Sequence, residues 1–148
     1  KPTRLLLALA IPAMVIQSVF AASPSLTSIL PRGAHRGHEV ELNFHGDRLD
    51  DAVEIMTYTA GFEVGMIEVI SPKHVKAKIT IAKQAALGEH LMRIRTSSGL
   101  SQVKSFWVGQ FGNLNEKEPN SDFSSPQPVA MNSTVEGKSI FSSAAPGL

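Results

Sequence analysis

Alternation of apolar and polar residues is the main feature of the chain between residues 25 and 109. It is clearest at 38–46, HEVELNFHG, where Val40, Leu42 and Phe44 are separated by polar residues. Successive side chains of a strand point to opposite faces, so a period of two gives one apolar and one polar face. The pattern predicts a strand that directs these three side chains into a core.

Three further stretches repeat this alternation: HVKAKITIA at 74–82, GEHLMRIRT at 88–96 and KSFWVG at 104–109. Each predicts a strand with one buried face. For the last stretch we expect two side chains inward and one outward, respectively Phe106, Val108 and Trp107.

Two stretches between these strands, at 52–58 and 62–70, are strand-like but less regular, and Gly65 predicts a β-bulge in the second. Turn-forming glycine, proline and serine residues separate all of these stretches, and no helical pattern interrupts them. About six or seven short strands with this punctuation predict an all-β fold, an antiparallel β-sandwich.

Three segments carry a resemblance to a known family: LTSILPRGAHRGHEVELNFHGDRL, LGEHLMRIRTSSGLS and FWVG. They contain a strand leading into a proline–glycine turn, a glycine after the second strand, and a final strand after a serine–glycine turn. In this order they resemble the IPT/TIG immunoglobulin-like domains. The resemblance implies an immunoglobulin-like sandwich at 24–110. It departs at His90, where the family has an aromatic or aliphatic residue and where we expect a half-buried ring.

Composition limits the chemistry that this fold can carry. The chain has 148 residues, 43% of them hydrophobic and 18% charged, which suffices for one core. It contains no cysteine, and this excludes disulfides, thiolate metal sites and a cysteine nucleophile. Packing and hydrogen bonds must therefore hold the fold together.

The first 21 residues have the layout of a secretory signal peptide. Lys1 and Arg4 precede the apolar run at 5–16, and small residues follow it. A membrane anchor is the alternative, but the run is shorter than the roughly 20 residues that a spanning helix needs, and Pro12 interrupts it. We expect cleavage, no membrane attachment afterwards, and a secreted, periplasmic or cell-surface location.

Removal of this segment changes the charge balance. Two of the fourteen basic residues lie in it, which leaves twelve against thirteen acidic residues. No basic surplus remains to attract nucleic acid, so we expect no nucleic-acid partner.

The composition shifts after residue 110, and the region 111–148 is more polar. A solvated linker is one interpretation. However, EKEPNSDFSSPQPVAMNSTVEGK at 116–138 resembles the start of the bacterial pre-peptidase C-terminal domain, whose remaining strands the sequence does not contain. This resemblance implies an incomplete second β-domain, so we expect 113–148 to be poorly ordered or to lean on the first domain. It also implies further domains in a longer protein.

Oxygen-bearing side chains alternate within this region, which suggests a calcium site. Glu116, Glu118, Asn120 and Asp122 would project oxygens to one side of an extended segment. Hard oxygen ligands suit Ca²⁺, which takes six to eight of them. The alternative is that these are solvated charges of a linker.

Other candidate chemistry is sparse. The histidines lack accompanying carboxylates at metal-ligand spacing, so we expect scattered surface residues rather than a zinc centre: His35, His38, His45, His74 and His90. No nucleophile elbow, zinc-protease motif or phosphate-binding loop is present. Four cations could form a basic strip on one outer sheet face, neutralised by two glutamates: Lys76, Lys78, Arg93 and Arg95, with Glu39 and Glu41.

These observations favour a non-enzymatic, secreted immunoglobulin-like module for spacing, display or binding, with a protein or polysaccharide partner that the sequence does not identify. Two alternatives stay open. The chain could be the N-terminal accessory region of a secreted protease or other hydrolase, or it could be a calcium-dependent adhesion module. Apart from possible calcium, we expect no cofactor.

Overall fold

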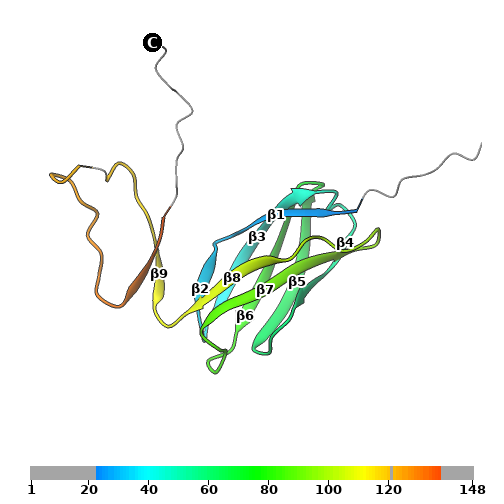
Figure 1. The fold of residues 1–148 in the computed structure, drawn as a ribbon, viewed down its shortest axis with the longest axis horizontal. Helices are drawn as coiled ribbons and strands as arrows, with labels where there is room; N and C mark the ends of the chain where they lie inside the picture. The colour runs from blue at the N-terminus through cyan, green and yellow to red at the C-terminus, as the bar shows by residue number, and fades with distance from the viewer. Residues whose placement is uncertain (1–22, 121, 138–148) are drawn as a thin grey trace, which may run out of the picture.

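The computed structural model describes residues 23–120 and 122–137, and these form an all-β structure (Figure 1). The expected signal peptide at 1–21 lies outside the described residues. The strands are β1 (Ser25–Leu30), β2 (Gly33–His35), β3 (Glu39–Asp47), β4 (Ala52–Thr57), β5 (Phe62–Ser71), β6 (His74–Ile81), β7 (Gly88–Thr96), β8 (Lys104–Gly109), β9 (Gly112–Asn115) and β10 (Ser133–Glu136). Within the described ranges, no helix is long and apolar enough to cross a membrane.

Two four-stranded sheets pack face to face and form the sandwich. The strand orders are β1-β3-β6-β5 and β2-β8-β7-β4, and we call these sheet A and sheet B. All pairings within them are antiparallel except that of β2 with β8, which is parallel. The predicted fold class, an immunoglobulin-like β-sandwich, is therefore confirmed.

The core lies between the sheets and consists of the inward faces that alternation predicts. Trp107 is 56% exposed between two buried neighbours, as expected. Strand β5 changes register between Val64 and Ile67, which confirms the bulge predicted at Gly65. The buried apolar side chains are Leu26, Ile29, Ala34, Leu42, Phe44, Leu49, Ile55, Val75, Ala77, Ile79, Ile81, Ala85, Met92, Ile94, Phe106 and Val108.

The chain passes from sheet A to sheet B between β1 and β2, and this crossing positions Trp107. The backbone N–H of Trp107 donates to the Arg32 carbonyl at 3.0 Å, and Gly33 pairs with Trp107 across β2 and β8. A Cβ atom at Gly33 would lie 2.5 Å from the Trp107 carbonyl oxygen. Only glycine permits this close approach, so the turn fixes the backbone on which the Trp107 side chain is carried.

Residues 110–137, here called the C-terminal arm, contain the parallel pair β9–β10 and lie beside β2 (Figure 1). The Asn113 side-chain amide donates to the Gly33 carbonyl at 2.6 Å, and the Arg32 N–H donates to Glu136 Oε1 at 2.6 Å. None of the arm's described residues is buried. In this structure the arm therefore leans on the sandwich and has no core of its own, because two short strands cannot enclose one.

Candidate ligand-binding site

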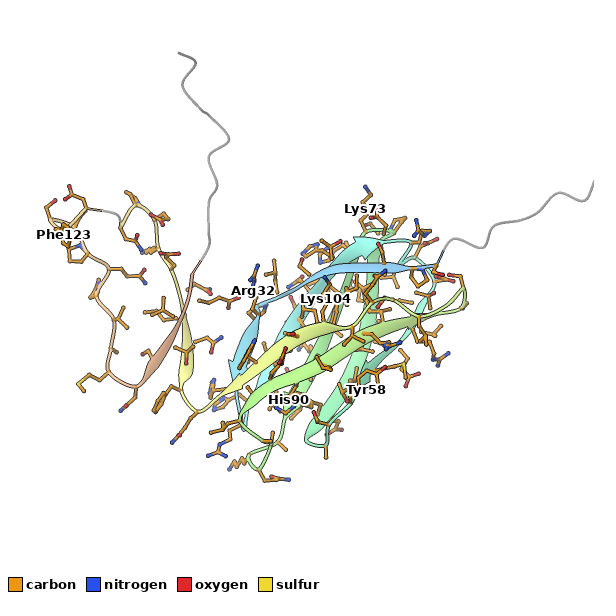
Figure 2. All side chains as sticks on the ribbon, viewed as in Figure 1. Arg32, Tyr58, Lys73, His90, Lys104 and Phe123 are labelled. Atoms are coloured by element: carbon orange, nitrogen blue, oxygen red, sulfur yellow. The ribbon has the colours of Figure 1, made fainter. Side chains whose placement is uncertain are left out.

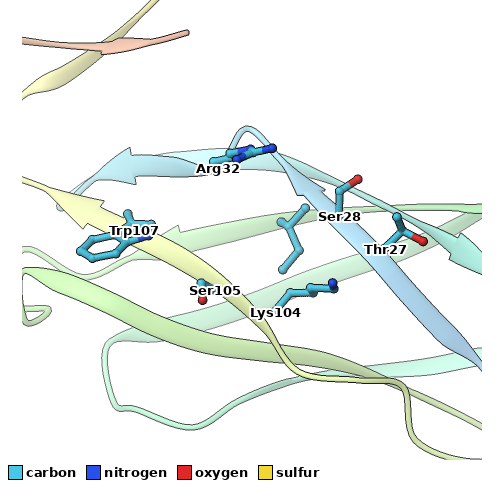
Figure 3. A pocket seen from close by; sticks show the side chains of 7 residues that line it. Thr27, Ser28, Arg32, Lys104, Ser105 and Trp107 are labelled. Carbon is cyan, nitrogen blue, oxygen red and sulfur yellow. The ribbon is translucent and has the colours of Figure 1, made fainter. Parts of the chain in front are cut away.

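A hollow opens between β1 and β8, where the first strand leaves the edge of sheet A (Figure 3). Strand β2 pairs with β8 only from Trp107 onward, so the earlier part of β8 has no strand beside it on this side. The hollow has a volume of about 280 Å³. We call it the Trp107 hollow, and its lining residues are Thr27, Ser28, Ile29, Arg32, Lys104, Ser105 and Trp107.

The lining combines an aromatic ring, hydroxyl groups and two cations. Ile29 is buried, whereas Trp107 is more than half exposed. Figure 3 shows Arg32 and Lys104 on opposite sides of the hollow, one from the turn after β1 and the other from the start of β8. An exposed aromatic side chain with convergent polar groups is the composition of many recognition sites.

The two cations of the hollow have no carboxylate partner among the described residues. Among the described residues, the ion pairs are Lys73–Asp47, Lys76–Glu41, Lys78–Glu39 and Arg95–Glu54. None of these ion pairs includes Arg32 or Lys104, whose positions are labelled in Figure 2. Both side chains are therefore available to an anionic group from outside.

Two carboxylates border the hollow, and each is engaged by a neutral donor. Glu89, which pairs with Trp107 across β7 and β8, accepts a hydrogen bond from the Ser105 hydroxyl. Glu136 on the arm accepts the Arg32 backbone N–H. They lower the positive potential of the hollow, but they do not pair with its cations.

A second hollow, of about 320 Å³, lies on the arm side of the same tryptophan. Asn113 and Thr134 of the arm line it together with residues of β2 and β8, including Trp107. The tryptophan thus borders both the Trp107 hollow and the junction between sandwich and arm.

The four residues predicted to bind calcium are hydrogen-bonded rather than open. The Asn120 side-chain amide donates to Glu116 Oε1 at 3.1 Å, and the Asn120 N–H donates to Glu118 Oε2 at 3.0 Å. Asp122 instead accepts the Ser124 N–H at 3.1 Å, and this bond lowers the pKa of the Asp122 carboxyl. Within the described ranges, no three His, Asp or Glu side chains gather as metal ligands. Calcium binding here stays a prediction.

Four of the histidines form two pairs, which the sequence-based expectation of scattered residues did not foresee. The His35 and His38 rings lie 3.8 Å apart, and those of His45 and His74 stack at 4.6 Å. The second pair follows from strand register, because these residues are direct partners in β3 and β6. Burial and, to a smaller degree, the His38 charge lower the pKa of His35.

The fifth histidine is fully buried, not half-buried as expected: His90 is 3% exposed. Its Nε2 donates to the Ala86 carbonyl at 2.8 Å, and its Nδ1 lies 2.6 Å from the Thr59 hydroxyl. Burial is tolerated because both ring nitrogens have partners.

The basic strip that the sequence left possible does not form. Lys76 and Lys78 lie on β6 in sheet A, whereas Arg93 and Arg95 lie on β7 in sheet B. The two lysines pair with Glu41 and Glu39, as the sequence suggested, and Arg95 pairs with Glu54. The Arg93 guanidinium lies 5.3 Å from the centre of the Tyr58 ring. Alternation assigns a residue to a face but not to one of two sheets, which explains the error.

Sequence reasoning found the outward Trp107 but missed the cations beside it. Along the chain, six strands, β2 to β7, lie between Arg32 and the strand that carries Trp107. Only the approach of β1 and β8 brings them together, and no local pattern encodes it. An arginine within the proline–glycine turn at 31–33 was the one available signal.

No protein-family model and no curated protein matches the chain. Similar solved structures include SGBP-B of the Bacteroides ovatus mixed-linkage glucan utilization locus in complex with a mixed-linkage heptasaccharide (12% identity, TM-score 0.38, 57% of this chain and 22% of that one). A mutant of the Streptococcus sanguinis SrpA adhesin is 16% identical with a TM-score of 0.38, and the match covers 60% of this chain and 55% of that one. The BIgI domain of the S. agalactiae beta protein, bound to CEACAM1, is 13% identical with a TM-score of 0.35, and the match covers 79% of this chain and 100% of that one. The chain thus spans about a fifth and about half of the first two proteins, and its function must be inferred from its own residues.

Proposed function

We propose that this chain is a non-catalytic immunoglobulin-like binding module of an exported bacterial protein, and that it holds its ligand in the Trp107 hollow. One observation carries the proposal. An exposed tryptophan stands beside two cations without ion-pair partners, over a hollow that the fold leaves open at the edge of β8.

Exposure of the tryptophan alone would not suffice, because single exposed apolar residues are common. Its value for binding comes from its neighbours. The indole supplies a large rigid surface that loses little conformational entropy on binding, and the hydroxyl and cationic groups around it can fix a ligand's orientation. Aromatic and arginine side chains together are typical of the residues that dominate binding energy.

A polysaccharide fits this site better than a small free molecule. At about 280 Å³ the hollow is just below the roughly 300–1,000 Å³ of pockets that enclose a whole ligand. It can accommodate one unit of a longer chain, with the indole against the ring and the hydroxyls of Thr27 and Ser28 within the same lining.

The remaining parts of the proposal concern the setting of this module. Residues 1–21 would export the protein to the periplasm, the cell surface or the medium. The sandwich would be an IPT/TIG-type domain, and the arm would begin a pre-peptidase C-terminal-type domain of a longer protein. A role as accessory region to a secreted hydrolase is compatible with binding, since such a module would bring the substrate to an enzyme.

The test is binding of the full chain to a panel of neutral and acidic soluble polysaccharides, measured by affinity electrophoresis. Replacement of a central aromatic contact is expected to cost at least about tenfold in affinity, so Trp107→Ala should lose binding to that extent. Phe123→Ala is the matched control, because this phenylalanine is fully exposed on the arm and lines neither hollow.

Two results would refute the proposal. Unchanged affinity in Trp107→Ala, with circular dichroism identical to wild type, would remove the hollow as the binding site. Hydrolysis of a polysaccharide by the purified chain, abolished by one side-chain replacement, would contradict the non-catalytic role.

A further inference from the structure

We propose that the Trp107 hollow selects a negatively charged sugar, one that carries a carboxylate or a sulfate ester, with Arg32 and Lys104 holding the anion. The inference rests on the proposed function and narrows it from binding in general to one class of ligand. It follows from the charges of the described residues around the hollow.

Arg32 is held in place by its backbone while its side chain stays available. Its N–H donates to Glu136, and its carbonyl accepts the Trp107 N–H. The residue is therefore fixed relative to the indole, and Figure 3 shows its guanidinium over the hollow. A guanidinium is a planar fork that matches the oxygens of carboxylate and of sulfate, so it favours such groups over hydroxyls.

Lys104 supplies the second charge from the opposite wall. It is the first residue of β8, where it pairs with Met92, and it is only partly exposed. Its stem lies along the hollow in Figure 3, and no carboxylate lies within ion-pair distance among the described residues. A partly desolvated cation without a partner gains more from an incoming anion than an exposed, already paired lysine does.

The positive charge of the hollow matters for ligand choice because the rest of the protein has no surplus of basic residues. After residues 1–21 the chain carries more acidic than basic residues, so an anionic polymer is not attracted to the molecule as a whole. Selection for negative charge must then come from the hollow itself. Glu136 on the arm and Glu89 beside the tryptophan oppose it. The site is accordingly expected to be moderate in affinity and sensitive to salt.

The experiment uses two matched pairs of probes with the full chain. Polygalacturonate oligomers are compared with their methyl esters, and dextran sulfate is compared with dextran, so each pair shares a backbone and differs in charge. We expect the charged member of at least one pair to bind about tenfold more tightly by calorimetry, because hydrogen bonds to charged groups are roughly twice as strong as neutral ones. The pair that responds distinguishes carboxylate from sulfate.

Variants locate the effect within the hollow. Arg32→Gln and Lys104→Gln should each weaken the charged probe about threefold to tenfold and leave its neutral partner unchanged. Lys73→Gln removes the same charge from an exposed lysine that lies outside the hollow, and it should change nothing. Glu136→Gln keeps an acceptor for the Arg32 backbone N–H but removes the negative charge of this side chain, and it should tighten binding about twofold to threefold.

The outcomes separate this inference from the proposed function. Equal binding of charged and neutral probes, or charged binding that Arg32→Gln and Lys104→Gln leave intact, overturns the inference. Loss of all binding in Trp107→Ala would still support the hollow as the site in that case. No binding by any of the four probes also overturns the inference, whereas binding that ignores Trp107→Ala overturns the proposed function.

Discussion

Replacement of His90 by leucine should cost the fold about 1–2 kcal/mol, a value that follows from two hydrogen bonds. The Ala86 carbonyl can only accept, so Nε2 of the ring carries the hydrogen and Nδ1 accepts from the Thr59 hydroxyl. These bonds tie strand β7 to the loop before it and to the segment after β4. Leucine keeps an apolar body at this buried position but makes neither bond.

The magnitude depends on what happens to the abandoned partners. A net bond contributes about 0.5–1.5 kcal/mol, whereas a partner left buried without a bond costs about 1–3 kcal/mol. Thr59 and Ala86 are both exposed, so water can replace the imidazole at each. The net value of about 0.5–1.5 kcal/mol per hydrogen bond therefore applies. The loss of two bonds, partly offset by the greater hydrophobicity of the buried leucine, gives a total cost of about 1–2 kcal/mol. The T-shaped contact of the ring with Phe62, 4.9 Å between centroids, is also lost.

Urea unfolding followed by far-UV circular dichroism measures this free energy by linear extrapolation. A double-mutant cycle with Thr59→Val isolates one bond, and we expect a coupling of about 0.5–1 kcal/mol. A leucine variant as stable as wild type would show that the two bonds do not support the fold. Strictly additive single and double variants would show that Thr59 and His90 do not interact.

Three further predictions concern other parts of the chain. Gly46→Ala places a Cβ atom 1.9 Å from a backbone oxygen of β1, so it should lower the free energy of unfolding in urea by about 2 kcal/mol or more. In the control Gly112→Ala the new Cβ atom meets no atom within 4 Å and should leave this free energy unchanged. Equal effects of the two substitutions would contradict the observed packing. The pKa of His35 is lowered in the folded protein, so the folded protein takes up this proton less readily than the unfolded chain does. Stability should therefore fall as the pH drops through 6.5, the ordinary pKa of histidine, and His35→Gln should reduce the fall in melting temperature between about pH 7.5 and 5.5. Identical falls in the two proteins would exclude this cause. Calcium titration of the wild-type chain should release heat that is absent from the Glu116→Ala, Glu118→Ala variant, and the absence of heat from both, or equal heat from both, would dismiss the calcium proposal.

The inward and outward positions of the sandwich could be predicted from sequence because alternation is a local property. Phe44, Ile79 and Ile94 lie at the expected faces and are fully buried, and Trp107 lies outward. Each of these positions depends only on its place within one strand, where the period of two decides the face. The bulge at Gly65 is local in the same sense.

Strand partners could not be predicted, because sheet order depends on contacts between distant segments. The basic strip failed for this reason, since Lys78 and Arg93 belong to different sheets. The pairing of His45 with His74 and the meeting of Arg32 with Trp107 also arise only when the register is fixed. The candidate site therefore became visible only in three dimensions, although its central residue was already expected to face outward.

The parallel pairing of β2 with β8 has a mechanical consequence. The chain enters the sandwich through β1 and leaves it through β8, at opposite ends of the sandwich in Figure 1. If both ends were pulled apart, β2 and β8 would slide past each other along their length, so the hydrogen bonds between them would be loaded together rather than one after another. The close backbone approach at Gly33 lies within this β2–β8 pair. Such an arrangement of strands is suited to resist a pulling force applied between the two ends of the sandwich.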